Sequence, residues 1–188
     1  MLQSHPMRAQ IVALALLCPL PAQAVEREHQ VGIDAQFVSL KVVNTAGSNI
    51  GGAFGAHYSY GISDQFNLMA EGGFALHVVE PEVEKDKGPA PQQPKTIGHV
   101  GVGVGYVFDV ISWVPYIGLL GTGYVMGGGT RTSTGGAGGL AAALGIDYRA
   151  SRRLAIGIAA RQHFILSDFG TYPSWTSVGL RLSYTWGW

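Results

Sequence analysis

Apolar residues alternate with small or polar residues, at a period of two, through most of this chain. The C-terminal segment is the clearest example, with two faces made of alternate residues. Its apolar face and its small or polar face are, in order, Thr176, Val178, Leu180, Leu182, Tyr184, Trp186 and Trp188, and Ser177, Gly179, Arg181, Ser183, Thr185 and Gly187. A period of two is that of a β-strand, because successive side chains of a strand point to opposite faces.

Seven more segments show the same alternation. They lie near residues 30–40, 51–60, 66–78, 100–108, 115–126, 137–148 and 154–164. Each is about ten residues long, which is enough for a tilted strand to cross a bilayer. A soluble β-sandwich would carry a polar outer face, whereas here the apolar face needs lipid or a large core. The pattern therefore favours a membrane barrel of eight strands.

The connections between these segments alternate in length. Short turns are expected at 61–65, 109–113 and 149–153, and longer, more polar loops at 41–50, 80–95, 127–135 and 167–174. This alternation predicts an all-β fold, an eight-stranded antiparallel up-and-down transmembrane β-barrel, with both ends of the chain on the periplasmic side.

Aromatic residues are expected to mark the two membrane interfaces. Tyr60, Tyr106 and Tyr148 each precede a short turn, which predicts a periplasmic girdle. At the other end, Tyr172 and Trp175 are expected to form an outer aromatic belt.

Residues 1–24 are predicted to be a cleaved secretory signal peptide. Arg8 gives the positive start, residues 11–20 the apolar stretch, and 22–24 the small-x-small cleavage pattern. Cleavage would leave residues 25–188 as one exported barrel domain. Both Met1 and Met7 remain possible start codons.

Composition excludes several classes of protein. The 12 basic and 12 acidic residues give no net charge, which argues against a nucleic-acid partner. The one cysteine, Cys18, lies inside the predicted signal peptide, so neither a disulfide framework nor a zinc–cysteine site is expected.

The exported chain resembles the small eight-stranded outer-membrane β-barrels of Gram-negative bacteria, of the outer-membrane protein A and X type. Its last strand resembles the sequence that such proteins present to the barrel assembly machinery, through Leu182, Tyr184, Trp186 and Trp188. The terminal Trp departs from the usual Phe or Tyr. The resemblance implies an outer-membrane location, contact with outer-membrane lipid and lipopolysaccharide, and a monomer.

The face opposite the lipid is expected to line the lumen. An eight-stranded barrel has an interior just wide enough for side chains, and buried charges there need partners. Arg161 and Arg181 lie on neighbouring strands. We predict a polar network in which these cations meet carboxylates and a histidine, made of Asp34, Glu71, Asp147, Arg161, His163 and Arg181. A narrow pore or a ligand pocket lined by the same groups is the alternative.

Three histidines, His57, His77 and His99, lie on consecutive segments and face inward. Counting residues from the turns sets His57 much deeper than the other two. We therefore expect no metal site and no cofactor, and instead a hydrogen-bonded pair of His77 and His99.

Some small barrels are lipid A deacylases or palmitoyltransferases, which need a nucleophile and a base in contact. His163 and Ser167 are four residues apart, or ~13 Å along a straight strand. The deacylase motif His-x-Ser-Asn is broken after His163, and Asp168 is expected to form a turn. We therefore predict no catalytic residues. The expected role is envelope integrity or surface binding and adhesion through four extracellular loops, with a narrow pore or a lipid A acyl hydrolase or transferase as alternatives.

Overall fold

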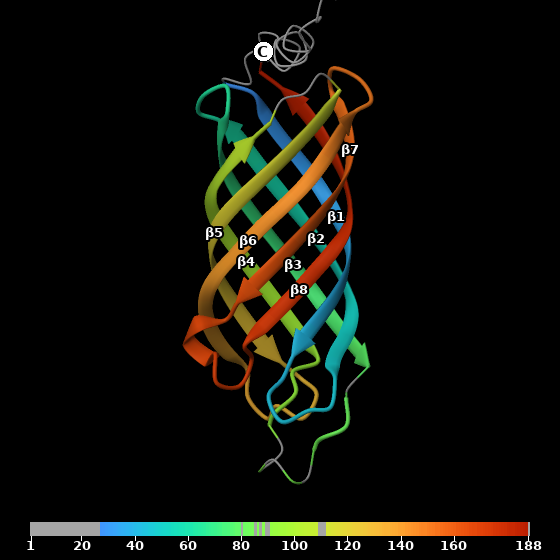
Figure 1. Ribbon diagram of the computed structural model, residues 1–188, viewed down its shortest axis with the longest axis vertical. Helices are drawn as coiled ribbons and strands as arrows, with labels where there is room; N and C mark the ends of the chain where they lie inside the picture. The colour runs from blue at the N-terminus through green and yellow to red at the C-terminus, as the bar shows by residue number, and fades with distance from the viewer. Residues whose placement is uncertain are drawn as a thin grey trace, which may run out of the picture.

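Eight antiparallel strands close into a barrel in which β1 pairs with β8 (Figure 1). The computed structural model describes residues 27–79, 81–84, 86, 88, 91–108 and 112–187. The strands are β1 (His29–Lys41), β2 (Ser48–Gly61), β3 (Phe66–Val79), β4 (Thr96–Val107), β5 (Trp113–Gly127), β6 (Gly135–Arg149), β7 (Leu154–Phe164) and β8 (Ser174–Trp186). A 3-10 helix, η2 (Leu166–Asp168), follows β7. The predicted fold class and strand order are confirmed.

The predicted signal peptide, residues 1–24, lies outside the described residues, as does Trp188. Among the residues that are described, no helix is long and apolar enough to cross a membrane.

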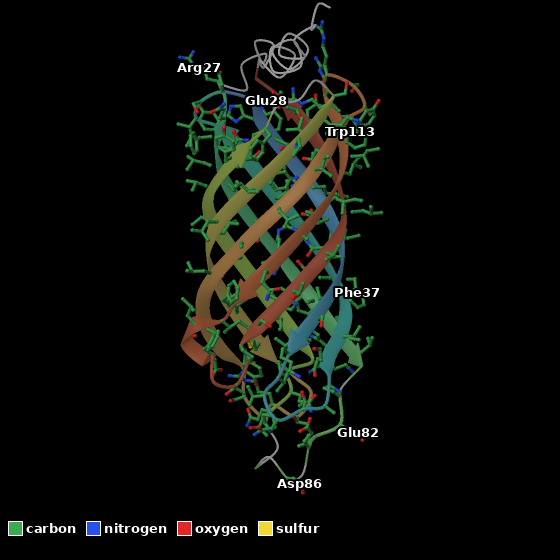
Figure 2. The ribbon with its side chains drawn as sticks, viewed as in Figure 1. Arg27, Glu28, Phe37, Glu82, Asp86 and Trp113 are labelled. Atoms are coloured by element: carbon green, nitrogen blue, oxygen red, sulfur yellow. The ribbon has the colours of Figure 1, made fainter. Side chains whose placement is uncertain are left out.

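The outer wall of the barrel is apolar. Phe37, on β1, is 57% exposed and points away from the barrel in Figure 2. Val102 on β4 and Leu180 on β8 are also well exposed, whereas their inward-facing neighbours such as Gly101 and Arg181 are buried. An apolar surface this extensive is not stable in water, and it matches the lipid-facing band of a membrane barrel.

The two ends of the barrel differ. The short connections 62–65 and 150–153, the end of β4 and the beginning of β5 lie at the same end as the beginning of β1 and the end of β8, at the top of Figure 1. The longer connections lie at the bottom. We call them loop 1 (42–47), loop 2 (80–95), loop 3 (128–134) and loop 4 (165–173).

Aromatic rings gather near the short-turn end. The ring of His29 stacks on that of Trp186, with centroids 5.2 Å apart, and lies 4.9 Å from Tyr60. Tyr148 contacts Trp113 at 4.9 Å. These contacts connect neighbouring strands where a periplasmic girdle is expected.

The prediction of Tyr172 and Trp175 as an outer belt is wrong. Trp175 is 0% and Tyr172 2% exposed. The reason is phase: Trp175 is an even number of residues from Arg181, so both face the lumen. The two rings join an apolar plug that fills the loop end of the barrel, made of Val38, Leu40, Val42, Ala75, Ile97, Tyr124, Met126, Ile165, Tyr172 and Trp175.

Candidate functional site

The polar half of the lumen lies between the apolar plug and the short-turn end. It contains buried carboxylates and guanidinium groups supplied by β1, β3, β6, β7 and β8. These residues are Asp34, Glu71, Asp147, Arg161 and Arg181. We call them, with His57, Ser183 and Tyr116, the polar network.

Arg161 connects β7 to β3 and β1. Its Nε donates to Glu71 Oε2 at 2.6 Å, and its Nη2 lies 3.7 Å from Asp34 Oδ1. All three side chains are almost fully buried. A charge-assisted hydrogen bond of this length inside a low-dielectric lumen holds the opposite walls of the barrel together.

Arg181 connects β8 to β6 and β5. Its Nε lies 3.4 Å from Asp147 Oδ1, and its Nη1 donates to the hydroxyl of Tyr116. The guanidinium carbon also lies 4.9 Å from the centre of the Tyr116 ring, which adds a cation–π contact. Each buried arginine therefore has a carboxylate partner.

His57 joins the network through both ring nitrogens. Nδ1 lies 2.8 Å from Asp34 Oδ2, and Nε2 lies 3.0 Å from Ser183 Oγ. The ring passes over Gly32 of β1, where an added Cβ would be 2.4 Å from His57 Cε1. Glycine at this position thus lets a β2 side chain reach β8.

Asp34, His57 and Ser183 have the connectivity of a catalytic triad, but not its access. Ser183 is 1% exposed and does not line the neighbouring cavity. Its strand pairs with β1 on one side and β7 on the other, so the nearby backbone N–H groups are engaged in ladders and not directed at a substrate oxyanion. The arrangement acts as a clamp between strands.

His163 lies in a separate layer, closer to the loops than Arg161. Its Nδ1 lies 3.1 Å from the hydroxyl of Tyr124, its ring stacks on Trp175 at 4.4 Å, and it meets His99 edge-on at 5.5 Å. These contacts link it to the plug, whereas the other five predicted network residues are brought together in the polar half.

The predicted pair of His77 and His99 is wrong. The register of β3 and β4 aligns His99 with Gly73, while the backbone N–H of His77 donates to Lys95 O at 2.8 Å. The two histidines are therefore four residues, or ~13 Å, apart along the strands. Counting from the turns fails because tilted strands begin at different heights. Among the described residues no group of three or more His, Cys, Asp and Glu could hold a metal ion.

Sequence reasoning placed His57 in the lumen but missed it, with Ser183 and Tyr116, as a member of the polar network. Ser183 lies two residues after Arg181 in β8 and so faces inward as Arg181 does, which is a signal in the sequence that could have found it. Tyr116 lies in β5, where consecutive apolar residues at Leu119 and Leu120 obscure the two faces.

The polar half contains a partly open cavity of about 40 Å³, lined by residues such as Gln30, Asn67 and Arg149. This volume has room for about three water molecules. Water there can bind the polar atoms that the side chains leave over, such as Glu71 Oε1 and Arg161 Nη1. Beyond the cavity, the plug occupies the lumen.

The four loops form a connected layer outside the plug. Loop 1 pairs with loop 2 through the Thr45–Val83 bridge and with loop 4 through Val43 N to Thr171 O, 3.0 Å. Loop 3 meets loop 2, where Gln93 N donates to Thr130 Oγ1 at 2.7 Å. We call this assembly the loop layer.

Ser167 and Asp168 lie in η2, away from the lumen. Ser167 is exposed and its Oγ accepts a hydrogen bond from Gly138 N at 2.8 Å, whereas His163 is buried against Trp175. The structure therefore does not bring the base and nucleophile considered for acyl transfer together.

Comparison with known proteins agrees with this architecture. The family model described as outer membrane protein beta-barrel domain matches residues 11–185. No curated protein matches the sequence significantly.

Several solved structures have a similar shape. Neisserial surface protein A has a TM-score of 0.62 at 15% identity, with 85% of this chain and 97% of that chain covered. Ail, the attachment invasion locus protein of Yersinia pestis, has a TM-score of 0.56 at 12% identity, covering 86% and 99%. The N-terminal barrel of Pseudomonas aeruginosa OprF has a TM-score of 0.55 at 10% identity, covering 87% and 100%. At these identities the likeness concerns the fold alone.

Proposed function

Because the chain belongs to the outer membrane protein beta-barrel domain family, we propose that it is a non-catalytic outer-membrane barrel that binds at the cell surface through its loop layer. The packed lumen would make the barrel a rigid and closed component of the cell envelope. The four loops would give the barrel a binding surface. Surface attachment is the role that we favour, with envelope integrity as its structural counterpart.

The observation that carries this proposal is the contrast between the two ends of the lumen. At the loop end, the plug fills the interior with buried side chains such as Trp175, Leu40 and Met126. Outside it, backbone and side-chain hydrogen bonds hold the loops in one layer. Ordered loops over a filled barrel favour a protein that binds a partner on its surface over one that lets solutes pass through its lumen.

The two alternatives receive less support. A narrow pore would need solutes to pass the plug, and the cavity of about 40 Å³ lies on its periplasmic side. The pair considered for a lipid A acyl hydrolase or transferase, His163 and Ser167, would have to be in contact, but His163 is buried against Trp175 whereas Ser167 is exposed and accepts a hydrogen bond from Gly138 N.

A structural neighbour is consistent with surface attachment. Ail of Yersinia pestis is described as an attachment invasion locus protein, and one of its structures contains the heparin analogue sucrose octasulfate (TM-score 0.54, 12% identity). Those properties belong to Ail. They make attachment the first activity to test for this chain.

We also propose how the barrel is inserted into the outer membrane. Leu182, Tyr184 and Trp186 are exposed on the outer face of β8 and are available to the barrel assembly machinery. The same apolar face would then meet outer-membrane lipid and lipopolysaccharide. We expect a monomer, because the closed barrel leaves no strand edge unpaired.

The test compares two barrels in cells and in bilayers. Replacing residues 81–94 by an Asn-Gly turn shortens loop 2, and replacing residues 62–65 in the same way is the matched control at the periplasmic end. We expect the loop 2 variant to lose cell attachment, the control to keep it, and purified wild-type barrel to give no single-channel steps in planar bilayers. Regular conductance steps would instead support the pore, and attachment that survives loop 2 replacement would overturn the proposal.

A further inference from the structure

We propose that the loop layer contains a binding pocket for a neutral saccharide unit. The pocket is an open depression of about 390 Å³ at the outer end of the barrel, lined by residues that include Asn44, Gln92, Arg131, Asp168, Thr171 and Tyr172. Its volume is within the range of about 300–1,000 Å³ that small-molecule sites occupy. This inference rests on the proposed function, since it names what the loops would bind.

All four loops supply the pocket. Asn44 comes from loop 1, Gln92 from loop 2, Arg131 from loop 3, and Asp168, Thr171 and Tyr172 from loop 4. A site that needs all four loops would explain why the loops are bonded to one another rather than extended separately into solvent.

Hydrogen bonds between the walls fix the shape of the pocket. Val43 N donates to Thr171 O at 3.0 Å, joining loops 1 and 4, and the Tyr172 hydroxyl donates to Gln92 O at 2.6 Å, joining loops 4 and 2. Two N–H groups, of Thr171 and Tyr172, donate to Asp168 O at 2.9 and 2.8 Å. A ligand therefore meets walls that are already ordered, which lowers the entropic cost of binding.

The charges of the pocket balance. Burial raises the pKa of the Tyr172 hydroxyl, Arg131 opposes this shift and Asp168 adds to it, so both charges act on the same point. An anion attracted by Arg131 would be repelled by Asp168. A cation attracted by Asp168 would be repelled by Arg131. A neutral polyol avoids both penalties, because its hydroxyl groups can accept from a guanidinium and donate to a carboxylate.

The polar groups retain capacity for a ligand. Arg131 uses Nε for the carbonyl of Ser133, at 3.0 Å, and also hydrogen-bonds to the Tyr172 hydroxyl, which leaves part of the five N–H donors of its guanidinium for a ligand. Asp168 holds loop 4 through its backbone carbonyl, so its carboxylate can be altered without removing those turn bonds. Asn44 and Thr171 add an amide and a hydroxyl, the remaining types of group that pair with sugar hydroxyls.

The experiment uses the complete barrel in lipid nanodiscs. Maltose, lactose and N,N′-diacetylchitobiose serve as neutral probes, with sucrose octasulfate as an anionic probe and choline as a cationic one, all followed by calorimetry. We expect saturable binding of at least one neutral probe with a Kd of about 1 mM or tighter, and a loss of at least about tenfold in Arg131→Ala and in Asp168→Ala. Arg152→Ala, in the exposed turn at the other end, is the matched control and should bind as wild type.

The outcomes separate this inference from the proposed function. Binding of only the charged probes, or of none of the five, overturns the saccharide pocket, as does neutral binding that is unchanged in both pocket variants. Circular dichroism of each variant establishes that the barrel is folded. If cells lose attachment on loop 2 replacement while the pocket variants bind and attach normally, the inference alone fails. If attachment survives that replacement, the proposed function fails, whatever the probes do.

Discussion

The imidazole of His57 crosses over β1 and lies, through Nε2, 3.0 Å from Ser183 Oγ. β1 is the strand between β2 and β8, so this contact links two strands that are not neighbours in the sheet. Its other nitrogen is held by Asp34 of β1 at 2.8 Å. Three strands around the closure of the barrel are thereby joined by side chains as well as by the backbone ladder.

Gly32→Ala should destabilise the barrel by about 1–3 kcal/mol, since the new methyl group overpacks a filled site. An added Cβ would lie 2.4 Å from both His57 Cε1 and the carbonyl oxygen of Leu182. Gly138→Ala in β6 is the matched control, because nothing lies within 4 Å of its added Cβ. Urea unfolding in detergent micelles measures both, and equal stabilities would contradict the close approach at Gly32.

Arg161→Met should lower the free energy of unfolding by about 3–5 kcal/mol, because it leaves a buried carboxylate without its cation. The double variant Arg161→Met with Glu71→Met removes both members of the 2.6 Å pair and should recover part of that loss. Recovery is expected to be incomplete, since Asp34 also lies 3.7 Å from Arg161. A double-mutant cycle in urea gives the coupling energy, and a value near zero would show that the pair does not stabilise the barrel.

The sequence predicts the barrel well because every strand repeats the same two-residue pattern. It also predicts which charges enter the lumen, since Asp34, Asp147 and Arg181 follow from phase alone. It does not predict their pairing. Asp34 and Arg181 are direct register partners, yet the ion pair of Arg181 is with Asp147 and Asp34 bonds to His57.

Pairing depends on strand stagger and tilt, which decide which inward side chains share a height in the lumen. Neither quantity appears in the residue pattern of one strand. The same stagger separates His77 from His99. Trp175 is a different case, because its phase already indicates the lumen and only its nearness to a loop suggested the membrane interface.

Ser183 should not react with a fluorophosphonate, although its hydroxyl contacts a histidine that contacts an aspartate. The hydroxyl is buried, and the residues lining the cavity do not include it, so the reagent has no approach. The measurement is intact-protein mass spectrometry of the folded barrel after incubation, with a serine protease labelled in parallel. A single adduct that disappears in Ser183→Ala would make the clamp a nucleophilic site and would overturn the non-catalytic proposal.

Tyr172→Phe should loosen the loop layer by about 1 kcal/mol, the net value of a typical hydrogen bond, because it removes the 2.6 Å bond to Gln92 O. The wild-type contribution should also depend on pH. Burial raises the pKa of Tyr172 above its ordinary value of 10.0, so the folded state holds this proton more tightly than the unfolded state. The protonated Tyr172 hydroxyl therefore stabilises the folded state fully below pH 10, and this stabilisation declines as the pH rises through the folded-state pKa. Hydrogen exchange of the loop amides, measured below and above pH 10, tests this. The amides of the wild type should lose protection above pH 10. The amides of Tyr172→Phe should be less protected than those of the wild type below pH 10, and their protection should change less between the two pH ranges. Tyr148→Phe, at the exposed girdle, is the control, and an equal response in both variants would contradict the role of Tyr172.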